Sequence, residues 1–385
     1  MRKHIILIEG FYDTLDTFSE QLKQCFTAQG YSCFVYRDGV TLLDALREVL
    51  QTDDAAVVTF NNLGYSIEND PGENIWEFYQ TPYLNILMDH PFRYRSILHK
   101  MPSTTIIATT DEYHANYVRR FFPDISQVFF LPHGGIESPQ PKMPLHERPI
   151  EVLYAGSLSR FQAESMIPEF DKMPEIDFED VSSVILNNLV SAPSTTLEDA
   201  LESYFQKQGL DYDDETLSMR ISQLRFLELY ATSFFREQAV RRIADAGHTV
   251  TVYGSGWDRC EWADHPHLDY RGTCSQREIL DHMAHSKLVL NTNSWFKAGA
   301  HDRIFNGMLE GACVLTDTSS YLNEQFTHER ELCFFELEEI GSLGTYADRL
   351  LSDSAKMQQI ADRGYQAALA AHTWMHRSHI IKEYL

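Results

Sequence analysis

The chain has 385 residues, of which 43% are hydrophobic and 12% aromatic, and its formal net charge is −24. This length favours two domains over a single core, and the apolar content excludes an intrinsically disordered chain. A surface with this negative charge repels the phosphate groups of nucleic acids and acidic lipids. We therefore expect neither nucleic-acid binding nor docking on an anionic membrane.

The cysteines and the apolar runs indicate the compartment. The six cysteines are scattered at 25, 33, 260, 274, 313 and 333, without the Cys-x-x-Cys spacing of a zinc or redox site. Several stand in apolar runs, as expected of buried free thiols in a reducing compartment. The run 5–8 is too short for a secretory signal, and no run is long enough to span a membrane. We therefore expect a cytoplasmic protein without a transmembrane segment.

The first part of the chain alternates short apolar runs with amphipathic stretches. Strands are expected at 5–8, 33–36, 55–60, 83–88, 105–109 and 128–131. Helices are expected at 15–29, at 42–50, and after the N-cap Asp111. This alternation predicts a doubly wound parallel sheet.

A second alternating series follows residues 137–148, whose proline, serine and lysine content is typical of a linker. Its strands are expected at 150–155, 249–253, 268–270, 288–290, 314–316 and 333–335. A strand-free, helical stretch separates the first two of these strands. The predicted fold is α/β, with two Rossmann-like doubly wound domains facing a cleft. Their expected limits are 1–140 and 149–365, with a helical insertion at about 160–246 and a C-terminal helix at 366–385 that packs back on the first domain.

Residues that follow strands of the second series predict a phosphate site. The segment 291–303 leaves a buried strand and enters a helix near His301. Lys297 and Arg303 beside a helix start could bind a diphosphate. A solvated surface loop is the competing interpretation, although the asparagine, tryptophan and glycine in this segment are unusual for one. His301 and Asp302 form either a base with its orienting carboxylate or a helix cap, and neighbours on a helix rarely face each other.

Two polar clusters end strands of the first series. Asp89 and His90 precede a proline, and a carboxylate or imidazole there could take a proton from an acceptor hydroxyl. His133 ends the last strand and could reach the same ligand. Stiffening of the turn by Pro91 and the start of the linker are the structural alternatives.

The run 303–317, Arg-Ile-Phe-Asn-Gly-Met-Leu-Glu-Gly-Ala-Cys-Val-Leu-Thr-Asp, resembles the donor-site helix of GT-B glycosyltransferases. It is most similar to the CgeB-like (spore-maturation-type) group with a glycosyl transferases group 1 C-terminal domain. Further segments of similar pattern are Phe235-Arg236-Glu237, Val252-Tyr-Gly-Ser-Gly-Trp257, Tyr321-Leu-Asn-Glu324 and Ala371-His-Thr-Trp374. The resemblance covers about 150–380 well and the N-terminal half loosely.

The resemblance implies sugar transfer from a nucleotide-sugar donor, of the UDP type, without a bound metal or other cofactor. Residues implied along the donor are Gly156, Ser157, Gly254, Gly256, Trp257, Tyr270, Asn291, Asn293, Lys297, His301, Asp302, Arg303 and Asn306. Many group 1 members carry glutamate where this chain has Asn306, and Glu310 stands one turn later. The acceptor, whether protein, glycan or small molecule, the sugar and the oligomeric state stay open.

Three alternatives remain beside this reading. Asp211 and Asp213 form an Asp-x-Asp triplet that could clamp a metal, but acidic caps at a loop and helix start are favoured. A sugar-nucleotide epimerase could share the fold, and so could a catalytically silent sugar- or partner-binding module. Asp89, His90 and His133 supply possible bases, which favours an enzyme.

Overall fold

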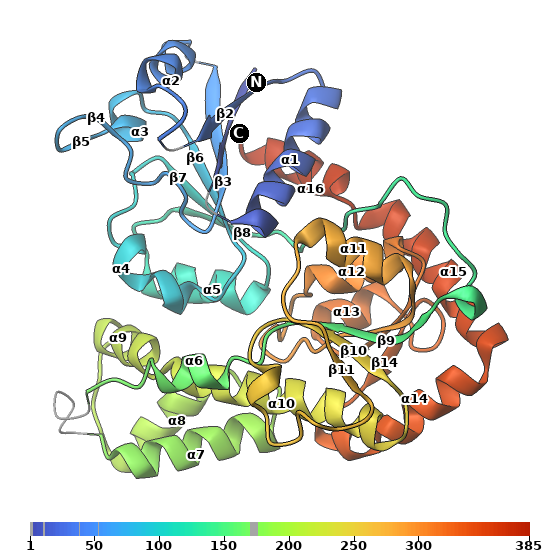
Figure 1. Ribbon diagram of the computed structural model, residues 1–385. Helices are drawn as coiled ribbons and strands as arrows, with labels where there is room; N and C mark the ends of the chain where they lie inside the picture. Colours follow the sequence, from blue (N-terminus) through green and yellow to red (C-terminus); the bar gives the residue numbers. More distant parts are fainter. Residues whose placement is uncertain (1–2, 11, 38, 53, 170–175) are drawn as a thin grey trace. The chain divides into compact units, whose positions relative to one another are not determined.

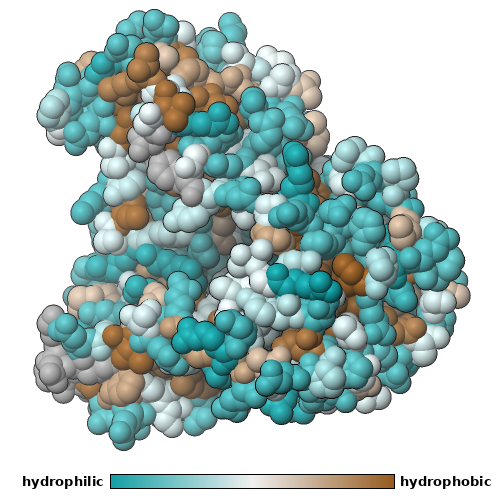
Figure 2. Space-filling view, in the orientation of Figure 1, coloured by the Kyte–Doolittle hydropathy of each residue, from teal (hydrophilic) through white to brown (hydrophobic). Residues whose placement is uncertain are grey.

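The computed structural model describes residues 3–10, 12–37, 39–52, 54–169 and 176–385. The chain forms two compact units (Figure 1). Unit 1 comprises Met1–Ile136 and Ala371–Leu385, and unit 2 comprises Glu137–Ala370. Figure 2 shows hydrophilic residues over most of the visible face, as the net charge of −24 leads one to expect. None of the described helices has both the length and the apolar content that a membrane span needs.

Unit 1 is built on a six-stranded parallel sheet of order β2-β1-β3-β6-β7-β8. Its strands are β1 (His4–Glu9), β2 (Ser32–Arg37), β3 (Ala55–Phe60), β6 (Tyr83–Leu87), β7 (Thr105–Thr109) and β8 (Gln127–Phe130). The helices are α1 (Asp13–Ala28), α2 (Leu43–Leu50), α3 (Ile75–Phe78), α4 (Arg95–Leu98) and α5 (Glu112–Phe121), with a small hairpin of β4 (Glu68–Asp70) and β5 (Glu73–Asn74). Every residue of β3, β6 and β7 is buried, because helices cover parallel sheets on both faces. The strand order reverses between β1 and β3, which is where such folds bind ligands.

The C-terminal segment completes the core of unit 1. Its helix α16 (Trp374–Ile381) packs on α1, and the Trp374 ring lies 5.1 Å from Phe18 and 5.8 Å from Phe60. A Cβ added to Gly134 would lie 2.8 Å from this ring, so only glycine fits there. Burial of the large Trp374 side chain therefore fixes the segment to this unit.

Unit 2 has a second six-stranded parallel sheet, of order β11-β10-β9-β12-β13-β14. Its strands are β9 (Ile150–Ala155), β10 (Val250–Tyr253), β11 (Leu268–Tyr270), β12 (Ser286–Leu290), β13 (Cys313–Asp317) and β14 (Cys333–Phe335). The helices outside the insertion are α11 (Gln276–Ala284), α12 (Asp302–Leu309), α13 (Ser320–Gln325), α14 (Leu343–Ser352) and α15 (Ser354–Ala371). Here the strand order reverses between β9 and β12, so the loops after these two strands mark the expected ligand position.

Between β9 and β10 the chain forms a group of helices (Figure 1). They are α6 (Arg160–Glu164), α7 (Phe178–Ser191), α8 (Leu197–Gln208), α9 (Asp214–Leu224) and α10 (Phe226–Asp245). Asp213 caps α9 by accepting a hydrogen bond from the Thr216 amide, which lowers the pKa of its carboxyl. In the described part of the chain, no three His, Cys, Asp or Glu side chains come together as a metal site requires.

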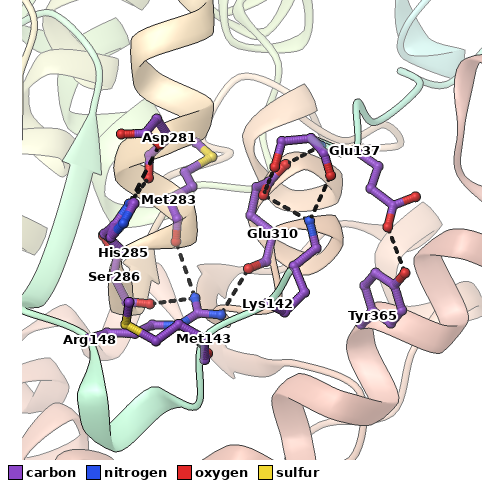
Figure 3. A network of polar contacts seen from close by, with 11 residues as sticks. Glu137, Lys142, Met143, Arg148, Asp281, Met283, His285, Ser286, Glu310 and Tyr365 are labelled. Atoms are coloured by element: carbon purple, nitrogen blue, oxygen red, sulfur yellow. Dashed lines mark hydrogen bonds and ion pairs between the residues drawn. The ribbon is translucent and has the colours of Figure 1, made fainter. Parts of the chain in front are cut away.

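The segment 137–148, whose composition predicted a linker, is tied to unit 2 (Figure 3). The fully buried Glu310 accepts hydrogen bonds from the Ser138 amide at 2.6 Å and hydroxyl at 2.7 Å, and it pairs with Lys142 at 3.0 Å. Arg148, 2% exposed, donates to the carbonyls of Met143, Ser286 and Glu310. Burial lowers the pKa of Arg148 to about 10. The segment is thus a fixed strap, and it occupies the Glu310 carboxylate.

Candidate functional site

Two glycine loops meet at the carboxyl ends of β9 and β10. Gly254 has φ +138°, and a Cβ there would lie 2.5 Å from the carbonyl of Gly156. The Gly156 amide donates to the Tyr253 carbonyl at 2.8 Å, and the Ser255 amide donates to Ser157 Oγ at 3.1 Å. Close approach of the two backbones therefore requires glycine, and it keeps the loop edge free of side chains.

Trp257 lies beneath these loops. Its side chain is completely buried, and its indole N–H donates to the Gly156 carbonyl at 2.8 Å. Gly256, with φ +90°, lets the chain turn there, because a Cβ would lie 2.5 Å from the Leu158 carbonyl oxygen. The expectation that Trp257 lies along the donor stays a prediction; in the structure its side chain has no exposed surface and supports the loops. Tyr270 ends the edge strand β11, and burial raises the pKa of its hydroxyl.

Arg303 is the buried cation at this edge. It stands in the first turn of α12 with 5% of its surface exposed. Its guanidinium donates to the Ala155 carbonyl and lies 5.5 Å from the Tyr154 ring centroid. A Cβ on Gly156 would lie 2.9 Å from its Nη1, so the glycine leaves room for this charge. The positive group therefore sits at the reversal point of the sheet.

His301, Asp302 and Asn306 form a chain of contacts at the start of α12. His301 caps the helix by accepting from the Arg303 amide, and its Nδ1 lies 2.5 Å from Asp302 Oδ1. Asp302 Oδ2 accepts from Asn306 Nδ2 at 3.0 Å. The structure thus brings together neighbours that a helix rarely pairs, but the residue that caps α12 is His301, not Asp302. Asn306 is fully buried and positions Asp302.

Asn291 and Asn293 shape the loop rather than line its surface. Asn291, fully buried, donates to Thr316 Oγ1 at 2.9 Å. Asn293, 1% exposed, accepts from the His301 amide at 2.9 Å and donates to the Gly299 carbonyl at 3.3 Å. These bonds hold the 293–301 loop in one conformation, which positions His301 and the helix behind it.

Lys297 is held by backbone carbonyls. Its ammonium donates to the carbonyl of Pro193, in the link between α7 and α8, at 2.6 Å, and also to that of Ser294. Nearby, Asp317 ends β13 with 1% exposure, and its Oδ1 accepts from the Asn293 amide. Burial raises the pKa of Asp317 to about 7, although that bond and the charges of Lys297 and Arg303 pull it down. A carboxyl that is largely protonated below pH 7 leaves the region positive.

Arg236 is a second buried guanidinium, which the sequence analysis did not select. It lies in α10 with 6% exposure and donates to the Ser157 carbonyl at 2.7 Å. Its guanidinium lies 5.2 Å from the Trp295 ring centroid. Arg236 and Arg303 therefore bind the carbonyls on either side of Gly156. The Phe235-Arg236-Glu237 pattern was the one signal, since nothing in a helical periodicity shows which arginine turns inward.

The candidates in unit 1 separate into one accessible acid and two packed histidines. Asp89, with 28% of its side chain exposed, follows β6. It accepts from Asn61 Nδ2 at 3.2 Å and from the Tyr94 hydroxyl at 2.9 Å, and it lies 3.6 Å from Arg93. Burial, followed by the nearby Asp89 charge, raises the pKa of Tyr94 well above its usual value. Asp89 is thus a fixed, partly solvated carboxylate, as a proton acceptor should be.

The two histidines, His90 and His133, pack against aromatic side chains. His90 Nδ1 accepts from the Phe92 amide at 3.2 Å, and its ring stacks on the Phe92 ring at 4.0 Å. His133 is 5% exposed, and its ring lies 6.1 Å from Phe18. The His133 carbonyl accepts from Arg377 Nε at 2.9 Å. The expected catalytic role of His133 stays a prediction; in the structure its ring packs in the core that the C-terminal segment closes.

Comparison with known proteins agrees with this arrangement. Residues 232–383, less than half of the chain, match the family model described as glycosyl transferase-like. A search of curated proteins finds no match. The solved structure of sucrose-phosphate synthase from Thermosynechococcus elongatus is similar at 12% identity and a TM-score of 0.55, over 99% of this chain and 98% of that chain. AviGT4, a glycosyltransferase involved in avilamycin A biosynthesis, is similar at 10% identity and a TM-score of 0.50, over 99% and 96%. The shared architecture is the GT-B fold of two parallel-sheet α/β domains.

Proposed function

We propose that this chain is a glycosyltransferase that moves a sugar from a nucleotide-sugar donor to an acceptor hydroxyl, with the donor bound by unit 2. The observation that carries the proposal is the buried Arg303 guanidinium beside Gly156, at the reversal point of the sheet. A buried cation is costly unless an anion or several acceptors compensate it, and a diphosphate provides both. The glycosyl transferase-like match of residues 232–383 supports the same assignment.

The donor diphosphate is the group that the charges of unit 2 fit. Arg303 provides a guanidinium at the start of α12, where the helix dipole is positive, and Arg236 adds a second buried cation beside the Ser157 loop. Lys297 would exchange the Pro193 carbonyl for a phosphate oxygen. As the sugar–phosphate bond breaks, its electron pair passes to the diphosphate oxygen, and these cations stabilise the charge that develops.

The acceptor chemistry belongs to Asp89 in this proposal. As the acceptor oxygen forms its bond to the anomeric carbon, its proton passes to the Asp89 carboxylate. Asn61 and Tyr94 hold that carboxylate in place by donating hydrogen bonds to Oδ2. His90 and His133 take no part in the step, because both are engaged in packing.

Two finer assignments rest on the sequence resemblance. The run 303–317 supports membership of the CgeB-like group, and that resemblance supports a UDP-sugar as donor. We also propose that transfer needs no metal, since two arginines and a lysine supply the positive charge that a cation provides elsewhere. Activity should then survive a chelator, and a strict need for a divalent cation would contradict this point.

A thermal-shift screen against a panel of nucleotide sugars tests the function. A ligand that binds only the folded protein raises its melting temperature by mass action. We expect stabilisation by one nucleotide sugar and by its nucleoside diphosphate, and by neither free sugar nor orthophosphate to the same degree. If no nucleotide stabilises the protein at millimolar concentration, the proposed function is wrong.

A further inference from the structure

Unit 1 contains a cavity that the donor chemistry does not use. It has a volume of about 490 Å³ and lies where β1, β2 and β3 end, with Ile8, Tyr36 and Asn62 on its walls. This position is the reversal point of the unit 1 sheet, between β1 and β3. A cavity of this size is large enough for a small organic ligand.

Most side chains of the lining are aliphatic or aromatic. Its aliphatic part comes from Ile8, Leu43, Leu63 and Ile67, and two tyrosine rings are added. Neither lysine nor arginine occurs among the described residues of its wall, and the one charged side chain there is the exposed Glu68. An anionic ligand would therefore be repelled, whereas an uncharged ring compound would remove apolar surface from water.

The wall after β3 is preformed. Asn61 and Asn62 have φ of 45° and 68°, a left-handed backbone conformation that residues other than glycine adopt uncommonly. The buried Asn85 holds this backbone conformation in place. Its Oδ1 accepts from the main-chain N–H of Asn62 at 2.9 Å, and its Nδ2 donates to Asn62 Oδ1 at 2.8 Å. Gly64 packs directly on Ile8, since a Cβ there would lie 2.2 Å from its Cδ1. Strained backbone held this firmly is typical of functional sites.

Asn62 also carries an unsatisfied donor. The residue is 4% exposed, and its Nδ2 has no hydrogen-bond partner among the described residues. Buried polar groups are almost always paired, so the side-chain N–H group of Asn62 is expected to donate to an acceptor oxygen of a ligand. The preceding residue, Asn61, donates to Asp89 at 3.2 Å. One loop therefore forms the cavity wall and positions the proposed base.

We infer that this cavity binds an uncharged, mainly apolar ring compound whose oxygen accepts a hydrogen bond from Asn62. That this compound is the sugar acceptor rests on the proposed function, whereas the binding itself does not. Val40 and Leu42, just before the lining residue Leu43, are each 76% exposed and extend the apolar surface. Figure 2 shows hydrophobic residues gathered over α2, the helix that begins at Leu43.

Equilibrium dialysis of the full chain with 2-naphthol tests the inference, with 2-naphthyl phosphate as the anionic comparator. Ser66 lines the cavity and is exposed, so Ser66→Trp should fill it without disturbing the core. Ser32→Trp, at an exposed position at the opposite end of β2, is the matched control. We expect 2-naphthol to bind at least about tenfold more weakly to Ser66→Trp than to the wild type and the control. Equal binding by the two tryptophan variants, or equal binding of the phosphate, overturns the inference.

The variant Asn62→Asp tests the hydrogen bond. Aspartate tolerates the left-handed backbone and keeps an oxygen for Asn85, but it removes the donor. Binding of 2-methoxynaphthalene, whose oxygen can only accept a hydrogen bond, should fall about tenfold in the folded variant, and the buried carboxylate should lower its melting temperature. Calorimetry with UDP separates the two claims: UDP binding without 2-naphthol binding overturns this inference alone, and the reverse result leaves the cavity assignment standing while the proposed function fails.

Discussion

The two units share one architecture but present different chemistry where their strands end. In unit 2 the buried groups at this edge include the cations Arg303 and Arg236, with glycines that leave the backbone bare. In unit 1 they are Asn62 and an apolar cavity, beside the carboxylate of Asp89. The difference indicates that a common scaffold is specialised by the few residues that follow its strands: one edge for a polyanion, the other for a neutral molecule with a removable proton.

Each unit also contains a buried titratable group whose pKa is shifted by burial, Asp317 in unit 2 and His372 in unit 1. Burial raises the pKa of Asp317 in unit 2 to about 7, so its neutral form is favoured. Burial, together with the Arg377 charge, lowers the pKa of His372 in unit 1 to about 3, so its neutral form is favoured too. The consequences for stability are opposite. Asp317 makes unit 2 lose stability as pH rises from about 4 to about 7, and His372 makes unit 1 lose stability as pH falls below about 6.5.

The largest effect is expected for Asp89→Asn in unit 1. Turnover should fall by roughly 100- to 10,000-fold, because the variant cannot take the acceptor proton. The affinity for the donor should stay within about twofold, since unit 2 carries the diphosphate site. Steady-state kinetics together with calorimetry separate the two quantities, and Asp124→Asn, at an exposed acid of the same unit, is the control. Equal losses of turnover and of donor affinity would contradict the assignment of proton transfer to unit 1 and of donor binding to unit 2.

The next effect concerns Asp317 and pH. In the folded protein its pKa lies near 7 rather than 3.8, so the free energy of unfolding of unit 2 should decrease by on the order of 4 kcal/mol between pH 4 and pH 7. Asp317→Asn removes the titrating group and should flatten this dependence. Urea unfolding at several pH values, followed through hydrogen exchange in β13, measures it. A variant that retains the wild-type slope would assign the pH dependence to another group; Asp258→Asn, at an exposed acid, should retain it.

A smaller effect is expected for Lys297→Met. The ammonium now donates to the carbonyls of Pro193 and Ser294, so part of its gain on binding phosphate is lost in breaking those bonds. Affinity for a nucleoside diphosphate should fall by about tenfold. Lys287→Met, at the start of β12, is the matched control. Unchanged affinity in titration calorimetry would leave Lys297 as a structural link between the loop and the insertion.

Much of this fold could be predicted from the sequence, because buried parallel strands are short apolar runs. The runs at 55–60 and 105–109 coincide with β3 and β7. The candidate site was placed by the rule that ligands bind where parallel strands end, and its position stays a prediction. These features depend on local pattern alone.

What the sequence did not predict depends on packing between distant segments. Trp257 and His133 stand in loops after strands, yet both are buried by partners that are remote in the chain. The strap at 137–148 has the composition of a linker, and only Glu310, about 170 residues later, makes it rigid. Arg236 is one of several arginines in its helix, and the Ser157 loop alone identifies it as the buried one.

The central claim is that Arg303 in unit 2 binds the diphosphate of a nucleotide sugar. Titration calorimetry with UDP on the wild type, Arg303→Ala and Arg303→Lys tests it most directly, with Arg271→Ala, an exposed arginine after β11, as the control. We predict a loss of affinity of roughly a hundredfold or more for the alanine variant, a smaller loss for lysine, and none for the control. Undiminished UDP affinity in a correctly folded Arg303→Ala variant would contradict the account.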